Sequence, residues 1–174
     1  MTFALASGET RVAEVHWKRK ESSHATAEVA GATWTLARGG FLNPRISVHV
    51  EGATPEIVRV SPHLNYHRIE IAGGANYRLH RAGHLVPAWK ITTDDGREVA
   101  HIEPVREGRA LMAGAVLTEP PASDSPDLLP LLVSSWYFIG LSWFEDEALI
   151  PFEGSDAPDA ATPKSGASEG SPGS

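Results

Sequence analysis

The chain of 174 residues is long enough for one domain, and its 41% hydrophobic and 21% charged residues exclude a wholly disordered or fibrous protein. Fifteen lysines and arginines against 22 aspartates and glutamates give a net charge of −7, which disfavours general binding to nucleic acid phosphates. The absence of cysteine excludes disulfides, thiolate nucleophiles and cysteine-ligated metal centres.

The first residues, Met1 to Ala6 (MTFALA), do not have the pattern of a secretory signal. The apolar run is too short for a signal core, and no basic residue precedes it. We therefore expect an intracellular, cytoplasmic protein.

Short apolar or alternating segments, separated by glycine, proline, asparagine and aspartate, recur up to about residue 117. Ile46, Val48 and Val50 alternate with polar residues, and a period of two places the two sets on opposite faces of a sheet. Asp95-Gly96 separates two such segments and predicts a tight hairpin, because glycine accepts a positive φ. The predicted strands are Val12–Trp17, Thr33–Ala37, Ile46–Val50, Glu56–Val60, Tyr66–Ile71, Asn76–His80, Ala88–Thr92, Glu98–Glu103 and Leu111–Leu117.

These closely spaced strands with short turns predict a mainly β fold. We expect an antiparallel barrel or a strongly curved sheet of about nine to twelve strands.

The segment Leu128–Phe144 has no charged residue and predicts a helix with apolar residues on every face. Asp127 is suited to cap its first turn, and Pro130 falls where a missing N–H costs little. Such a helix is surrounded either by protein or by lipid. Seventeen residues span only ~25 Å, and no basic residue flanks the ends. The pattern favours a buried helix enclosed by the sheet, with a membrane tail anchor as the alternative.

The charge distribution divides the chain into two parts. Residues 1–110 carry 14 basic and 12 acidic groups, whereas residues 111–174 carry one basic and ten acidic groups. Residues 154–174 contain no aromatic or large aliphatic side chain that could offset the entropy of ordering them. We expect a β-barrel domain over residues 1–150, with its central helix at 127–144, and a disordered acidic tail over 154–174.

The order of these elements carries a resemblance to a known family. The relevant segments are Trp34-Thr35-Leu36, Asn76-Tyr77-Arg78-Leu79, Pro87–Ile91 followed by Asp95–Glu98, and the helix Leu128–Phe144. Over about residues 12–146 the chain resembles the tubby-like superfamily, which includes the LURP-one-related proteins and the phospholipid scramblases. The resemblance implies an antiparallel barrel around a C-terminal hydrophobic helix, and basic surface residues that hold phosphoinositide head groups.

The sequence offers no catalytic, cofactor or metal motif. His63/His67 and His80/His84 have an H-x-x-x-H spacing, but they lie at predicted strand ends and turns, where this spacing does not align two rings. There is no G-x-S-x-G motif, and neither glycine pair opens a helix to form a phosphate loop. A non-catalytic binding or scaffold protein is expected, and a hydrolase with a site assembled from distant residues is an alternative.

The densest basic cluster follows the first predicted strand, at Lys18, Arg19 and Lys20. Together with Arg38 and Arg78, these residues are the candidates for binding an anionic lipid head group or a small ligand. The alternative interpretation is a charged edge strand that resists pairing with other sheets.

Overall fold

The computed structural model describes residues 2–7, 9–17, 23–40, 44–82, 88–107, 110–118 and 125–145. The fold is mainly β, with one antiparallel sheet and one C-terminal helix, as predicted. Each strand of the sheet pairs with the next strand in the sequence. The eleven strands are β1 (Thr2–Ser7), β2 (Thr10–Trp17), β3 (His24–Val29), β4 (Ala32–Gly39), β5 (Arg45–Val50), β6 (Glu56–Pro62), β7 (His67–Ile71), β8 (Asn76–Ala82), β9 (Ala88–Thr93), β10 (Glu98–Glu107) and β11 (Ala110–Thr118).

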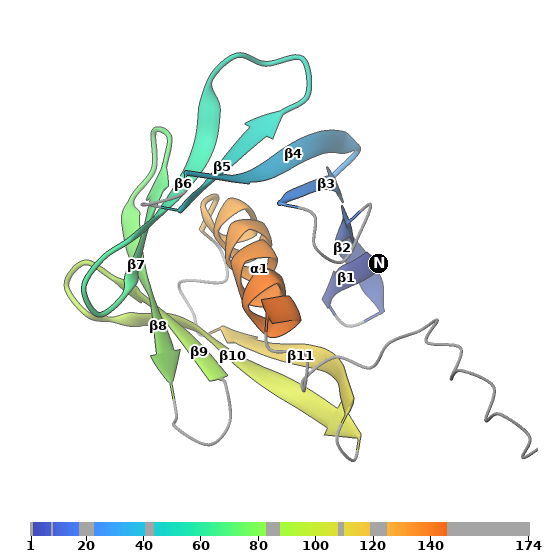
Figure 1. Ribbon diagram of the computed structural model, residues 1–174, viewed down its shortest axis with the longest axis vertical. Helices are drawn as coiled ribbons and strands as arrows, with labels where there is room; N and C mark the ends of the chain where they lie inside the picture. Colours follow the sequence, from blue (N-terminus) through green and yellow to red (C-terminus); the bar gives the residue numbers. More distant parts are fainter. Residues whose placement is uncertain are drawn as a thin grey trace, which may run out of the picture.

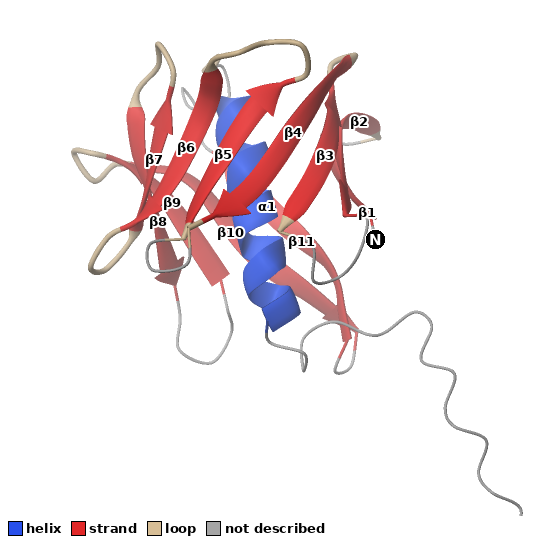
Figure 2. Cartoon of the chain, turned by 45° about the horizontal axis from the view of Figure 1, so that its top comes forward, coloured by secondary structure: helices blue, strands red, loops and turns tan. Residues whose placement is uncertain are grey.

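The sheet is strongly curved and surrounds helix α1 (Leu128–Glu145) on several sides, as Figures 1 and 2 show. Among the described residues, β1 pairs only with β2 and β11 only with β10. The sheet is therefore a curved one and not a closed barrel.

The alternation of side chains explains why one face of the sheet forms the core. Val48 of β5 pairs with Leu36 of β4 and with Val58 of β6, and all three side chains are buried. Paired residues share a face of the sheet, so these residues form an apolar row across the three strands. The row lies on the concave side, where α1 packs against β2, β5, β6 and β7.

The uncharged segment forms the buried helix that the sequence favours. Leu131, Val133, Tyr137 and Ile139 are fully enclosed, with no exposed surface. The two serines Ser134 and Ser135 are buried with them. Because the protein surrounds this helix, apolar residues occupy every face of it. Within the described ranges, no helix is both long enough and apolar enough to cross a membrane.

All nine predicted strands are present, and the structure adds two more. β1 and β3 were not predicted, and β3 reaches β4 through a two-residue turn at Ala30 and Gly31 with φ of 49° and 82°. A positive φ is uncommon for alanine, so the turn has no strong signal in the sequence. The predicted hairpin at Asp95-Gly96 is confirmed, with Gly96 at a φ of 89°.

The N-terminal end of α1 is attached to the β7–β8 turn by a carboxylate. Asp127 Oδ2 accepts hydrogen bonds from the Ala75 backbone N–H at 2.9 Å and from the Tyr77 hydroxyl at 3.1 Å. The Asp127 carbonyl accepts from the Leu131 N–H, which begins the helix. A Cβ atom on Gly74 would lie 2.5 Å from Asp127 Oδ1, so a larger residue there would displace the carboxylate. Asp127 therefore stands at the start of the helix as predicted, but the described contacts of its carboxylate join the helix to the sheet and do not cap the first turn.

The acidic tail expected over residues 154–174 lies outside the described residues.

Candidate ligand-binding site

The candidate site lies at the other end of α1 and begins with an arginine on the concave face of the sheet. Trp34 and Leu36 of β4 point into the core. Arg38 is the next residue on that face, and it pairs with Ile46 of β5, which is also buried. Because side chains alternate along β4, the partly buried Arg38 lies on the same concave face as Trp34 and Leu36.

A cavity of about 190 Å³ separates this part of the sheet from the last turns of α1. The sheet contributes a cation, an imidazole and apolar side chains, and the helix contributes an aromatic ring, a leucine and a hydroxyl. The lining residues are Arg38, Pro44, Ile46, Val60, His67, Phe138, Leu141 and Ser142. The cavity therefore has a mixed polar and apolar lining, with one permanent positive charge.

His67 reaches this cavity from the first position of β7, on the same face as the buried Ile69. Its ring centroid is 4.2 Å from that of Phe138 and 6.4 Å from that of Trp89. Burial lowers the pKa of His67 below its ordinary value of 6.5, and the charge of Arg38 lowers this pKa further. The imidazole is therefore neutral at pH 7, and it adds a hydrogen-bonding ring but no second charge.

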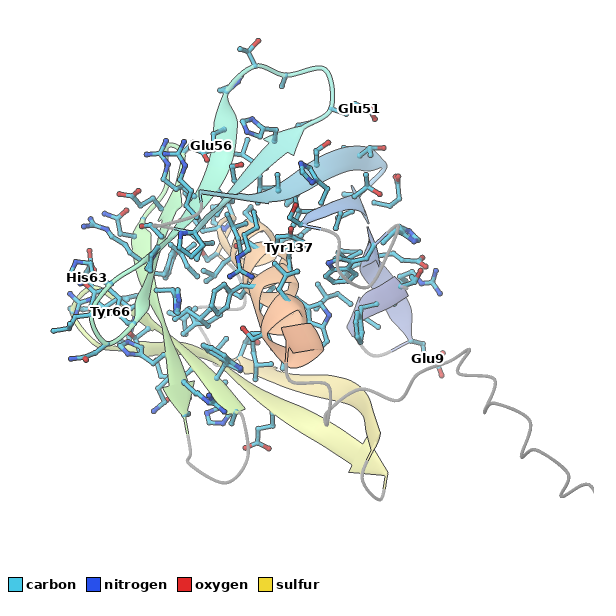
Figure 3. The ribbon with its side chains drawn as sticks, in the orientation of Figure 1. Glu9, Glu51, Glu56, His63, Tyr66 and Tyr137 are labelled. Atoms are coloured by element: carbon cyan, nitrogen blue, oxygen red, sulfur yellow. The ribbon has the colours of Figure 1, made fainter. Side chains whose placement is uncertain are left out.

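Backbone and side-chain contacts fix the position of Arg38 relative to the helix. The Ser23 carbonyl accepts hydrogen bonds from the Arg38 backbone N–H at 2.8 Å and from the Tyr137 hydroxyl at 2.7 Å. Tyr137 also stacks on Trp17, with 5.7 Å between the ring centroids. Tyr137 lies on α1, inside the curve of the sheet (Figure 3). Burial raises the pKa of Tyr137, so its hydroxyl stays protonated and remains a donor.

A histidine and a serine meet at this cavity, yet their arrangement is unsuited to nucleophilic catalysis. The Ser142 hydroxyl donates a hydrogen bond to the Phe138 carbonyl at 3.1 Å, one turn earlier in the helix. The C-terminal end of a helix presents carbonyl groups and not N–H donors, so α1 does not supply an oxyanion hole here.

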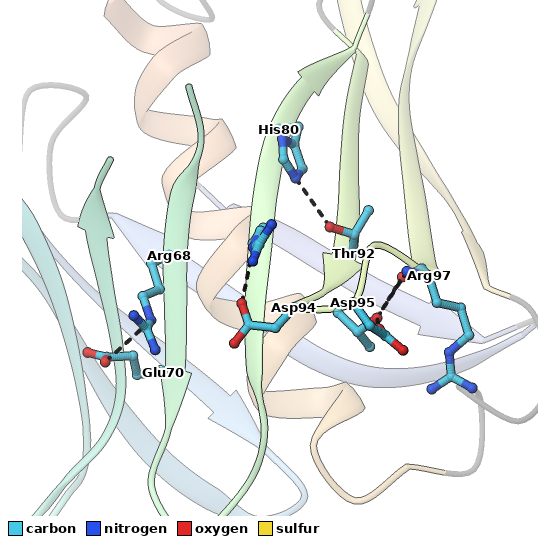
Figure 4. A network of polar contacts seen from close by, with 9 residues as sticks. Arg68, Glu70, His80, Thr92, Asp94, Asp95 and Arg97 are labelled. Atoms are coloured by element: carbon cyan, nitrogen blue, oxygen red, sulfur yellow. Dashed lines mark hydrogen bonds and ion pairs between the residues drawn. The ribbon is translucent and has the colours of Figure 1, made fainter. Parts of the chain in front are cut away.

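Arg78, the other described arginine among the candidates, faces the opposite side of the sheet from Arg38. Its Nε lies 3.1 Å from Asp94 Oδ1, and its guanidinium carbon lies 5.2 Å from the centre of the Tyr66 ring. It belongs to a set of polar pairs on the outer face, with Arg68–Glu70 and His80–Thr92 beside it (Figure 4). These contacts explain Arg78 as part of a solvated sheet face. The structure therefore does not bring Arg38 and Arg78 together.

Lys18, Arg19 and Lys20 lie outside the described residues. The residues on either side of that segment, Trp17 and Ser23, both contact Tyr137 at the Arg38 end of the molecule.

His63 and His67, one of the two pairs with H-x-x-x-H spacing, do not act as a unit. His67 points into the cavity, whereas His63 stacks on Tyr66 at the outer edge of the sheet, with 4.6 Å between the ring centroids (Figure 3). His80 lies 3.2 Å from the Thr92 hydroxyl, and its partner in the spacing, His84, lies outside the described residues. In the part of the chain that the structure describes, no three potential metal ligands of the His, Cys, Asp or Glu type are grouped.

Sequence reasoning missed His67 and the apolar cavity wall as parts of a site. One signal was present in the sequence, because His67 has the same parity as Ile69 and Ile71 and so shares their face. Phe138, Leu141 and Ser142 gave no comparable signal, since every face of the helix is apolar.

Comparisons with family models, with curated proteins and with solved structures give no match to this chain.

Proposed function

We propose that this is a non-catalytic binding protein that takes a small anionic ligand or a lipid head group at the end of the sheet where α1 ends. The observation that carries the proposal is the cavity into which Arg38 projects. Ligand sites are typically concave and mainly apolar, with a few polar groups that orient the ligand. The cavity beside Arg38 and His67 is concave and combines apolar with polar lining residues, and its only permanently charged lining residue is a cation.

Lys18, Arg19 and Lys20 enter the proposal as a second source of positive charge. They directly follow Trp17, whose ring stacks on Tyr137. Each basic residue near an anionic membrane surface contributes about 1 kcal/mol to binding. If these three residues supplement Arg38, the protein binds an anionic surface weakly and in a salt-dependent manner.

We also propose that the protein is of the tubby-like type. Eleven antiparallel strands that curve around an apolar C-terminal helix support the proposal, although the sheet of the described residues is not closed into the barrel that this relationship implies. The relationship by itself does not identify a ligand, because one fold serves many functions.

Two binding assays test the proposed function. In the first, the protein is sedimented with phosphatidylcholine vesicles, with or without phosphoinositide, at low salt. In the second, a panel of small organic and inorganic anions is added while the protein's NMR spectrum is recorded. We expect binding in at least one assay, and reduced binding after Arg38→Gln or after the triple change Lys18→Ala/Arg19→Ala/Lys20→Ala.

Arg78→Gln is the matched control, because Arg78 is also a strand arginine but lies on the outer face against Asp94. The proposed function fails if all vesicles leave the protein in the supernatant and no anion shifts its spectrum. It also fails if Arg78→Gln weakens binding as much as Arg38→Gln.

A further inference from the structure

We infer that the two edges of the sheet, β1 and β11, form a docking surface for one extended segment of a partner protein, which pairs with both edges as a twelfth strand. No described residue that lines the cavity beside Arg38 belongs to either strand, so this surface is additional to the proposed ligand site. Three features support it, namely the composition of the edge strands, their direction and the apolar side chains between them.

The two edge strands differ in charge from all the other strands. β1 (TFALAS) and β11 (ALMAGAVLT) contain no Asp, Glu, Lys or Arg, whereas each of the nine strands between them contains at least one. Neither edge strand contains proline. Proteins commonly protect an exposed edge with charged residues or proline, because its open row of N–H and C=O groups pairs readily with another chain. Charge and proline are missing from both edges here, so both are suited to pairing.

The direction of the two edges fits a single inserted strand. Each strand is antiparallel to the next, so the odd-numbered strands β1 and β11 run the same way. A direct pair between them would be parallel, whereas one strand inserted between them is antiparallel to both, which is the slightly more stable pairing. The strands follow one another around α1 in Figure 1, and β1 and β11 flank the opening of the sheet.

Apolar side chains on the inner side of this opening set the pattern of the partner strand. On β1, Leu5 is buried and Phe3 packs against Trp136 of α1, with 5.9 Å between the ring centroids. On β11, Val116 is partly buried against the same core. Leu132 lies one turn before Trp136 on α1 and is also only partly buried. A strand that covers these side chains needs apolar residues at every second position.

The direction of α1 favours a segment of another molecule over a continuation of this chain. Leu129, near the start of the helix, borders the same groove as Val12 of β2. A Cβ atom on Gly140 would lie 3.2 Å from the ring of Trp17, at the other end of β2. Helix α1 therefore runs in the direction of β2 and opposite to β1 and β11. A chain that passed straight from the end of α1 into the opening would run parallel to both edges.

A second copy of this chain fits the two edges less well than one inserted strand. Two copies related by a two-fold axis can pair β1 with β1 or β11 with β11, but each such pair covers one edge and leaves the other open. The partner is therefore an extended segment of a different protein, with alternating apolar residues and no proline. Its length matches the six residues of β1 and the nine residues of β11.

Selection from a displayed library of linear peptides, as long as β11, tests this surface on the whole 174-residue chain. We expect the enriched peptides to carry apolar residues at every second position and to lack proline, which cannot donate to a ladder. If no peptide of this pattern is enriched, the inference is wrong.

N-methylation of a selected peptide shows whether it pairs with both edges. Alternate residues of an antiparallel strand direct their N–H groups to opposite neighbours, so methylation of the odd or of the even residues removes the hydrogen bonds to one edge. We expect each methylated form to bind at least about tenfold more weakly, because several hydrogen bonds are lost. A loss in only one form, or in neither, would overturn the inference.

Ala4→Lys locates the peptide beside β1. Ala4 is exposed and lies between Phe3 and Leu5, whose side chains face the core. The variant should prefer a peptide with glutamate at its outward positions over one with lysine by about two- to fivefold more than the unaltered protein does. Thr35→Lys is the matched control, because Thr35 is exposed on β4, which is paired on both sides. If the two lysine variants behave alike, the peptide does not lie beside β1.

Hydrogen exchange of the unaltered protein distinguishes the possible occupants of the opening. We expect the amides of β1 that point away from β2, and those of β11 that point away from β10, to exchange slowly only when the peptide is bound. Slow exchange of these amides in the free monomer would mean that the chain covers its own edges. Slow exchange that appears only at concentrations where dimers form would assign the edges to a second copy. Either result would reject a partner strand.

Discussion

At its N-terminal end α1 is held to the sheet by polar contacts, whereas toward its C-terminal end it meets the sheet through aromatic rings that border a cavity. The Asp127 carboxylate joins the helix start to Ala75 and Tyr77, and Gly74 leaves just enough room for it. At the other end, Arg38 and His67 line open space beside Phe138. The contrast teaches that hydrogen bonds to the β7–β8 turn fix the first end, while ring contacts beside a cavity position the second.

The largest expected effect comes from the middle of the helix, on which both ends depend. Ile139→Asp places a charge at a site with no exposed surface, and we expect a loss of more than about 4 kcal/mol in unfolding free energy. Urea denaturation followed by circular dichroism measures this loss. Leu64→Asp is the control, because Leu64 is 92% exposed and should change stability by less than about 0.5 kcal/mol. A cooperatively folded Ile139→Asp protein would contradict an enclosed helix.

The comparison of the two helix ends is tested directly by removing one polar side chain from each. Asp127→Ala removes the acceptor of two hydrogen bonds and should lower stability by about 2–3 kcal/mol. In the described contacts, the Ser142 hydroxyl donates a hydrogen bond to the Phe138 carbonyl of its own helix. Ser142→Ala removes this bond and should lower the unfolding free energy by less than about 0.5 kcal/mol. Equal losses measured by urea denaturation would show that the two ends contribute alike.

Gly74→Ala tests the contact between the β7–β8 turn and the Asp127 carboxylate at the N-terminal end of α1. The new Cβ would meet the Asp127 carboxylate, so the carboxylate must move and stability should fall by about 1–2 kcal/mol. Gly39→Ala is the matched strand-end control, because no atom lies within 4 Å of a Cβ there. In a double-mutant cycle, Gly74→Ala should cost little once Asp127→Ala is present. Additive losses would contradict the contact.

Ser135→Ala is expected to stabilise the protein by about 1 kcal/mol. The Ser135 hydroxyl is buried and has no hydrogen-bond partner among the described residues, so the fold bears its desolvation cost without compensation. Ser134→Ala is the control, because that hydroxyl donates to the Leu131 carbonyl at 3.1 Å. Thermal unfolding of the two variants compares them, and a lower Tm for Ser135→Ala would reveal a partner for this hydroxyl.

The smallest expected effect is a pH dependence of stability that arises from His67, near the C-terminal end of α1. The pKa of His67 is lower in the folded protein than its ordinary value of 6.5, so the unfolded chain binds this proton first. Stability is therefore retained above pH 6.5 and falls as the pH drops from 6.5 toward the folded pKa. His67→Gln should flatten this decline in Tm between about pH 7 and pH 5.

His80 contributes in the same direction, since burial and then Arg78 and Lys90 lower its pKa. His80→Gln is thus the comparison variant. NMR titration should also show that Arg38→Gln raises the pKa of His67, because Arg38 is one cause of its depression. An unchanged His67 pKa in that variant would contradict the proximity of the two side chains.

Local patterns were enough to predict most of the elements. Alternation predicted strands such as Ile46–Val50, and the uncharged run at Leu128–Phe144 predicted the buried helix to within one residue of its end at Glu145. Strand β3 was not predicted, because the turn that joins it to β4 places Ala30 at a positive φ. Alanine rarely adopts this conformation, so the sequence gives no turn signal there.

Of the predicted binding residues, Arg38 and Arg78 lie on opposite faces of the folded sheet. Arg38 follows the buried Leu36 by two positions, whereas Arg78 lies between the buried Tyr77 and Leu79. The parity was readable, but the sequence did not indicate which apolar positions would surround a shared cavity.

The sequence by itself determined that this protein is mainly β and that an uncharged helix follows the strands, because periods of two and an uncharged run are local properties of the chain. The tertiary structure alone decided that Arg38, His67 and Phe138 meet. These residues come from β4, β7 and α1, and they become neighbours only because the sheet curves around the helix. Such curvature is a collective property of the twisted, paired strands, and no single segment encodes it.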